Sequence, residues 1–189
     1  MIIRPHRIVQ HYALNRQAPS GGNRQGWRWL VVTEPAKKKP IQEWYHEAWS
    51  NVTASGYGKS EGLPPEEAAS NERVMRSATY LAEHMHEVPV LIFACALTAG
   101  PSRDIAAGSS IYPAVQNLML AARALGLGTA LTTVHRVHQE DVRKLLDIPE
   151  TVETAALIPV GWPVGKFGSG FRLPVEKVTY WETWGSKRE

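Results

Sequence analysis

The alternation of apolar and polar positions predicts that this chain mixes strands with helices. Three short runs rich in β-branched and aromatic residues are typical of strands: Trp27 to Val32, Val90 to Leu97 and Ala155 to Val160. The run over 90–97 contains no polar side chain, which indicates a strand buried on both faces in the middle of a sheet. A further strand is expected over Thr129 to Val134.

Other segments repeat their apolar positions at helical spacing. Helices are therefore predicted over Ile41 to Ala54, from about Ser70 to about Glu87, over 111–126 and over Gln139 to Leu146. The stretch 55–70 contains three Gly and two Pro and is expected to be irregular.

The helix over 111–126 has the clearest boundaries. Ser109 or Ser110 can cap its start, and Pro113 then falls in the first turn, where its missing N–H breaks no hydrogen bond. The sequence Gly-Leu-Gly over 126–128 ends the helix.

At 189 residues the chain is expected to fold as one domain. The order of the elements predicts an α+β fold in which helices flank a central mixed sheet. The tail to Glu189 carries Trp181 and Trp184, which are too apolar for a free end. We expect this tail to dock on its own domain or on a neighbouring subunit.

Charge and hydropathy exclude several classes of protein. The 21 Lys and Arg only slightly outnumber the 18 acidic residues and are dispersed, so nucleic acid is not an expected partner. Their one dense cluster, Lys37 to Lys39, is expected to be a solvated helix start or turn. The longest apolar run, from Val88 to Leu97, is too short to cross a bilayer, and no apolar leader follows Met1. We therefore expect a cytoplasmic protein with no membrane partner.

Side chains of conventional catalytic types form no recognisable motif. Cys95 is the only cysteine, so no disulfide within the chain is possible, and its apolar neighbours indicate a buried thiol. The seven His include His84 and His86, which fall on different sides of a helix, and none of them has zinc-ligand spacing. A nucleophile elbow, a Walker A loop and a dinucleotide-binding glycine motif are also missing. We expect no metal site and no catalytic side chain.

One loop has the composition of a binding site. Residues 18–27 read Ala-Pro-Ser-Gly-Gly-Asn-Arg-Gln-Gly-Trp and lead into the first predicted strand. The glycines allow backbone N–H groups to approach a ligand, and Ser20, Asn23 and Gln25 offer hydroxyl and amide hydrogen bonds. The same residues are compatible with an ordinary turn. The amide-rich composition favours a site for a polar, anionic, planar ligand.

Four motifs in this sequence carry a resemblance to a known family. They are the loop over 18–27, Tyr112 to Gly128, Ile158 to Pro163 and Phe171 to Pro174. Together they resemble the FMN-dependent nitroreductase family, occur in the family's order and span about residues 18–185. The segment 112–128 is similar to the family's central dimer helix.

The resemblance implies a nitroreductase-like fold, with one FMN-binding domain over 18–189 after an atypical short segment at 1–17. It implies an intertwined homodimer with FMN at the subunit interface. The loop residues would contact the flavin and its ribityl chain, and the backbone of 132–135 would approach flavin N5. Residues 159–161 would lie beside the cofactor. Arg172 would bind the phosphate. The implied FMN-binding residues are Ser20, Asn23, Gln25, Thr132, Thr133, Val134, His135, Pro159, Val160, Gly161 and Arg172.

The N-terminus departs from the family pattern. Members usually carry an Arg-rich phosphate-binding segment and a helix before the loop, but only 18 residues precede Pro19. Three explanations stay open: a wrongly assigned start, a natural truncation or a different phosphate site. Arg4, Arg7 and Arg16 are candidates to substitute for the usual segment.

Two functions follow from the resemblance. The first is an FMN-dependent oxidoreductase that uses NAD(P)H to reduce a nitroaromatic, quinone or similar small-molecule acceptor by a ping-pong mechanism, with flavin N5 carrying the hydride. The alternative is a non-catalytic dimeric flavin-binding protein that kept the fold.

Overall fold

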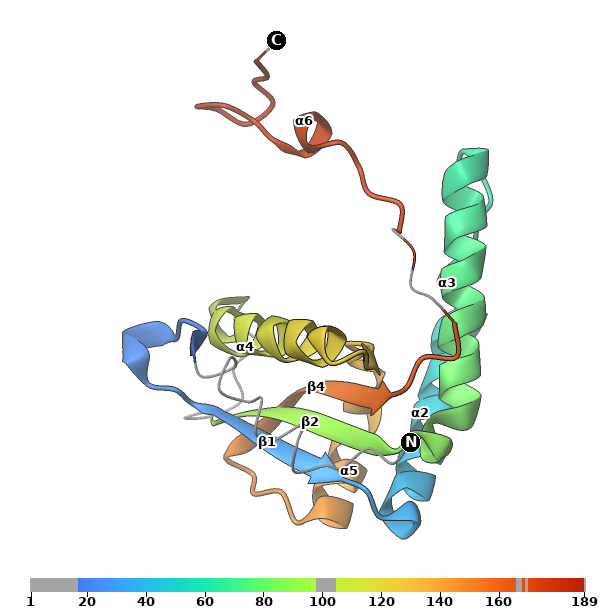
Figure 1. Ribbon diagram of the computed structural model, residues 1–189, viewed down its shortest axis with the longest axis vertical. Coiled ribbons are helices and arrows are strands. Elements are labelled where there is room, and N and C mark those ends of the chain that lie inside the picture. Colours follow the sequence, from blue (N-terminus) through green and yellow to red (C-terminus); the bar gives the residue numbers. More distant parts are fainter. Residues whose placement is uncertain (1–16, 98–104, 166–167, 169, 189) are drawn as a thin grey trace.

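The computed structural model describes residues 17–97, 105–165, 168 and 170–188. Four strands form one sheet in the order β1-β2-β4-β3 (Figure 1). The strands are β1 (Trp27–Val32), β2 (Val90–Leu97), β3 (Gly128–Thr129) and β4 (Val152–Gly161). The expected α+β fold is confirmed. The sheet was expected to be mixed, whereas every strand pair among the described residues is antiparallel.

The strand register fixes which loops lie at which end of the sheet. Trp27 of β1 lies opposite Ala96, and the Leu97 N–H donates to the Gly26 carbonyl at 2.8 Å. Val90, at the other end of β2, lies opposite Val160 of β4. The loop before β1 and the end of β4 are therefore at opposite ends of the sheet, as Figure 1 shows.

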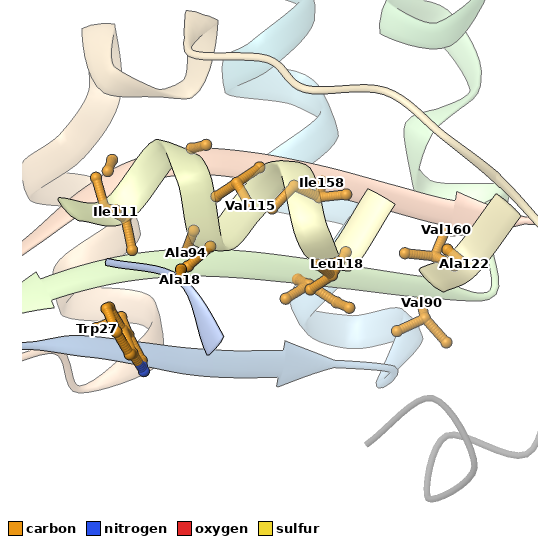
Figure 2. Close-up of a cluster of buried hydrophobic side chains, with 14 of the residues drawn as sticks. Ala18, Trp27, Val90, Ala94, Ile111, Val115, Leu118, Ala122, Ile158 and Val160 are labelled. Carbon is orange, nitrogen blue, oxygen red and sulfur yellow. The ribbon is translucent and has the colours of Figure 1, made fainter. Parts of the chain in front are cut away.

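One face of the sheet packs against the long helix α4 (Ile105–Ala124). Figure 2 shows Ile111 and Leu118 of α4 between the helix and the strands, in a buried cluster that also contains Ile158 of β4. Each such side chain contributes about 1.5–3 kcal/mol on burial. This apolar helix therefore holds the central strands in place.

The opposite face packs against α2 (Pro35–Ala54) and α5 (Gln139–Leu146). Leu157 of β4 and Phe93 of β2 are fully buried on this face, while Ile158 points to the α4 side. The two central strands are thus apolar on both faces, as the sequence of β2 predicts. Cys95 is buried here, as expected, and burial raises the pKa of its thiol to about 11.

Two helices begin earlier than the periodicity predicts. The helix predicted from Ile41 begins at Pro35, and α3 (Pro65–His84) begins well before Ser70, so all of 65–70 is helical instead of irregular. Proline is favoured at a first helical position because its φ is already helical and its absent N–H would be unpaired there. A single turn of 3-10 helix, η4 (Met85–Glu87), then leads from α3 into β2.

The expectation of a solvated cluster over Lys37 to Lys39 is wrong for Lys38. This residue lies in the first turns of α2 and is 6% exposed. Its Nζ donates to the Val88 carbonyl at 2.7 Å, and burial lowers the pKa of the ammonium group. Lys38 thereby joins α2 to the segment that enters β2.

The strand expected over Thr129 to Val134 is largely wrong. Within this segment, pairing with β4 is confined to Thr129 of β3 and an isolated bridge between Thr132 and Leu157. The chain then turns into the 3-10 helix η5 (Val134–His138), which packs against α2. Pro113 also differs from expectation because α4 starts at Ile105, so the proline lies inside the helix.

The C-terminal tail leaves the sheet after β4 and runs clear of the body (Figure 1). It contains one helical turn, α6 (Val175–Val178), and its large apolar side chains are exposed, with Trp184 at 91%. Within the described residues the tail therefore does not cover its own domain. No helix in the described part of the chain is both long and apolar enough to span a bilayer.

Candidate functional site

The loop before β1 has an uncommon backbone conformation. Residues Gly21–Asn23 form the 3-10 turn η3, and Gly22, Asn23 and Gln25 have φ values of 58°, 55° and 51°. A left-handed glutamine is rare, and such conformations cluster at functional loops because the surroundings must hold them. The exposed amide of Gln25 donates to Asn23 Oδ1 at 3.2 Å.

Two hydroxyl groups hold this loop in place. Ser20 Oγ accepts the backbone N–H of Gln25 at 3.1 Å. Ser110 Oγ, in α4, accepts the Gly21 N–H at 3.2 Å. Ser20 thus shapes the loop, while Asn23 and Gln25 are exposed.

A pocket of about 470 Å³ lies at the other end of the sheet, between the last turns of α3 and the β3–β4 edge. Its walls are mostly apolar and also carry polar side chains, among them Ser77, His84, Glu87 and Thr129, as in sites for small organic ligands. The lining residues are Ser77, Tyr80, Leu81, His84, Glu87, Val88, Pro89, Gly128, Thr129, Ala130, Pro159, Gly161, Trp162 and Pro163. Two of the predicted FMN-binding residues, Pro159 and Gly161, are therefore part of this pocket.

Thr132 is fixed beside the same edge of the sheet. Its N–H donates to the Leu157 carbonyl at 3.0 Å, and its carbonyl accepts the Leu157 N–H at 2.8 Å. Its Oγ1 lies 2.7 Å from the hydroxyl of Tyr45, a buried residue of α2. Burial raises the pKa of Tyr45, so its phenol remains protonated and available for this hydrogen bond. The neighbouring Thr133 is exposed.

The side chain of His135 belongs to the core. It is 1% exposed, packs edge-on against Phe93, and its Nε2 lies 3.3 Å from the Thr154 carbonyl. Burial lowers its pKa to about 4, so the imidazole is neutral at physiological pH. Val134 packs against the same α2-side cluster. A cofactor would therefore meet these two residues through their backbone.

The remaining predicted residues are not gathered at the pocket. The side chain of Val160 is buried in the α4-side core. Arg172 lies in the exposed tail, where its guanidinium donates to the adjacent Phe171 carbonyl at 2.7 Å. The candidate phosphate-binding residues Arg4, Arg7 and Arg16 lie outside the described residues.

Sequence reasoning missed the contribution of α3 to the pocket. Tyr80 and His84 are stacked with their ring centroids 4.2 Å apart, and His84 Nδ1 lies 3.1 Å from Glu87 Oε1. The available signal was their spacing: Ser77, Tyr80 or Leu81, and His84 recur every three to four residues along one face of a helix.

Comparison with known proteins identifies the family. The model of the Nitroreductase family matches residues 6–162. The chain belongs to this family. Among its curated relatives, it is 27% identical over 174 residues to an NADH dehydrogenase of Thermus thermophilus, covering 87% of this chain and 80% of the relative. It is 26% identical over 157 residues to an iodotyrosine deiodinase of Thermotoga neapolitana, covering 82% of this chain and 76% of the relative.

Solved structures share the nitroreductase fold. An iodotyrosine deiodinase bound to FMN and 3-iodo-L-tyrosine superposes with a TM-score of 0.73 at 22% identity, covering 97% of this chain and 91% of that one. A variant of an FMN and NADPH-dependent nitroreductase from a sphigopyxis strain gives a TM-score of 0.71 at 16% identity, covering 97% and 92%. The nitroreductase-like fold expected from the sequence is confirmed, and family membership supports a flavin oxidoreductase.

The described residues fit part of an FMN molecule. The pocket is large enough for a flat ring system, and Pro159, Trp162 and Tyr80 give it apolar and aromatic walls. The described lining residues include no Lys or Arg, so a charged contact to the phosphate would come from outside this set, for example from Arg172.

Proposed function

We propose that this protein is an FMN-dependent oxidoreductase that uses NAD(P)H to reduce a nitroaromatic, quinone or related small-molecule acceptor in a ping-pong cycle. The observation that supports this proposal most directly is the pocket that Pro159 and Gly161 line together with Tyr80 and His84. It lies next to Thr132, whose backbone is hydrogen-bonded to Leu157. FMN, when bound, supplies the hydride chemistry, and the protein supplies binding, orientation and electrostatics.

The chain's own residues divide this work. Pro159, Gly161 and Tyr80 would pack against the flat ring. The double hydrogen bond of Thr132 to Leu157 and the Tyr45 hydroxyl would hold the backbone of 132–135 at the ring edge. Arg172 would bind the phosphate. Such pre-organised positioning lowers the cost of reaching the reactive geometry.

We further propose that the complete site needs a homodimer. The loop with Ser20, Asn23 and Gln25 lies beside Leu97, whereas the pocket lies beside Val90. With a rise of about 3.3 Å per strand residue, the two ends of β2 are roughly 23 Å apart. One chain's loop therefore cannot reach its own pocket, and the loop of a second copy would close it. The exposed apolar tail supports the same assembly, because a partner subunit would bury it.

The test is reconstitution of the purified full chain with FMN, followed by anaerobic addition of NADH or NADPH. The proposal expects a yellow dimer whose flavin absorbance is bleached by nicotinamide and restored by a quinone or nitroaromatic. A yellow dimer that neither nicotinamide reduces would favour a non-catalytic flavin-binding protein. A folded protein that takes up no FMN would contradict both functions.

A further inference from the structure

We infer that His84, held by Glu87 and stacked on Tyr80, is the proton donor to an acceptor that binds next to the flavin ring at the pocket between α3 and the β3–β4 edge. This inference rests on the proposed function, which requires a proton as well as a hydride. A quinone that takes a hydride, with its electron pair, becomes a hydroquinone only after one proton is added to an oxygen. A nitro group that becomes nitroso and water consumes one hydride and one proton in the same way.

The pocket offers one group suited to that task. Histidine is the side-chain type that exchanges a proton near neutral pH, and His84 is the only histidine among the lining residues described. The lining residues from the β3–β4 edge, such as Thr129, Pro159 and Trp162, do not titrate. The other ionisable lining groups are Tyr80 and Glu87, and both contact His84 itself.

Two carboxylates lie beside the His84 ring. Glu87 Oε1 accepts from Nδ1 at 3.1 Å, and Glu83 Oε2 lies 4.0 Å from Nε2. The hydrogen bond with His84 lowers the pKa of the Glu87 carboxyl, which therefore remains ionised and able to accept from the imidazole. His86, 3.9 Å from Glu87, is the other titratable neighbour of this pair and is not among the pocket-lining residues.

The same contacts orient the His84 ring and give it a partner through which a proton can return from water. Tyr80 covers one face of the imidazole at a centroid distance of 4.2 Å, which restricts rotation of the ring. With Nδ1 engaged by Glu87, Nε2 is the nitrogen that gives its proton to the acceptor oxygen. Glu87 is exposed to solvent, so the pair can take up a new proton from water after each transfer.

The experiment compares two acceptors with different proton demands. Protein loaded with FMN is reduced with dithionite under argon and mixed rapidly with benzoquinone, which needs a proton, or with ferricyanide, which takes one electron and no proton. In His84→Gln we expect the benzoquinone rate to fall about 100-fold and to lose its pH dependence, as for removal of a general acid. The ferricyanide rate, which depends on no proton, is expected to change less than threefold.

Two further variants complete the test. His86→Gln is the matched control and is expected to keep the wild-type benzoquinone rate and pH profile. Glu87→Gln removes the charged partner of Nδ1 and is expected to change the benzoquinone pH profile. The NMR titration of the His84 ring in the oxidised protein, assigned by its loss in His84→Gln, is expected to have the same midpoint as the rate and to move with it.

Several results would overturn the inference. One is a His84→Gln variant whose benzoquinone and ferricyanide rates fall together, or do not fall. If His84→Gln does not fold or does not bind FMN, the Glu87→Gln variant decides instead. An unchanged benzoquinone pH profile in Glu87→Gln would then overturn the inference. Because dithionite replaces nicotinamide, failure of NAD(P)H to reduce the protein contradicts the proposed function without affecting this comparison.

Discussion

His135 should make the stability of this protein depend on pH. Its imidazole is 1% exposed and has a pKa lowered by burial from 6.5 to about 4. The unfolded chain therefore binds a proton on this residue at a pH where the native protein does not. The stabilisation is complete above about pH 6.5 and is lost as the pH falls toward 4. The free energy of unfolding falls by about 3 kcal/mol when this loss is complete and by about 2 kcal/mol at pH 5.

Urea unfolding of the FMN-free protein at pH 8 and pH 5, at one protein concentration, measures this loss. His135→Gln keeps an N–H that can donate to the Thr154 carbonyl but cannot take up a proton. We expect the free energy of unfolding of the wild type to fall by about 2 kcal/mol more than that of the variant. His46→Gln, on the exposed side of α2, is the control and should behave like the wild type. Equal losses in the wild type and in His135→Gln would refute the assignment.

Three other predictions concern the cofactor and the assembly. Tyr45→Phe removes the hydrogen bond to Thr132 and should lower the free energy of unfolding, measured with urea, by about 1 kcal/mol. It should also weaken FMN binding in a fluorescence titration. Unchanged FMN affinity would show that the Thr132 segment does not depend on this bond. Arg172→Ala should weaken FMN binding about 10- to 150-fold, because a charge-assisted contact contributes about 1.5–3 kcal/mol. Binding of riboflavin, which has no phosphate, should stay unaltered. An equal loss of affinity for both ligands would exclude a phosphate contact. Trp184→Ala should leave the circular dichroism spectrum of the domain intact. It should raise the dimer dissociation constant, measured by sedimentation equilibrium, on the order of tenfold. An unaltered dissociation constant would show that Trp184 is not part of the dimer contact.

Much of the fold follows from local patterns. The ends of β1, β2 and the helix at Gln139–Leu146 agree with those predicted, because apolar spacing and β-branched content act within a few residues. The early starts of α2 and α3 had a readable signal in Pro35 and Pro65, the first residues of the two helices.

The sequence alone determined the class of the fold, its central apolar strands and, through four motifs in order, the family. Only the tertiary structure decided which of those residues meet. Packing buried Lys38 against the Val88 carbonyl, brought the Tyr45 hydroxyl to Thr132 and set Tyr80 and His84 against the β4 edge. The partners in these contacts lie far apart along the chain, so their meeting depends on how helices pack on the sheet and not on local propensity. The same packing separates the loop before β1 from the pocket, because a strand of fixed rise lies between them.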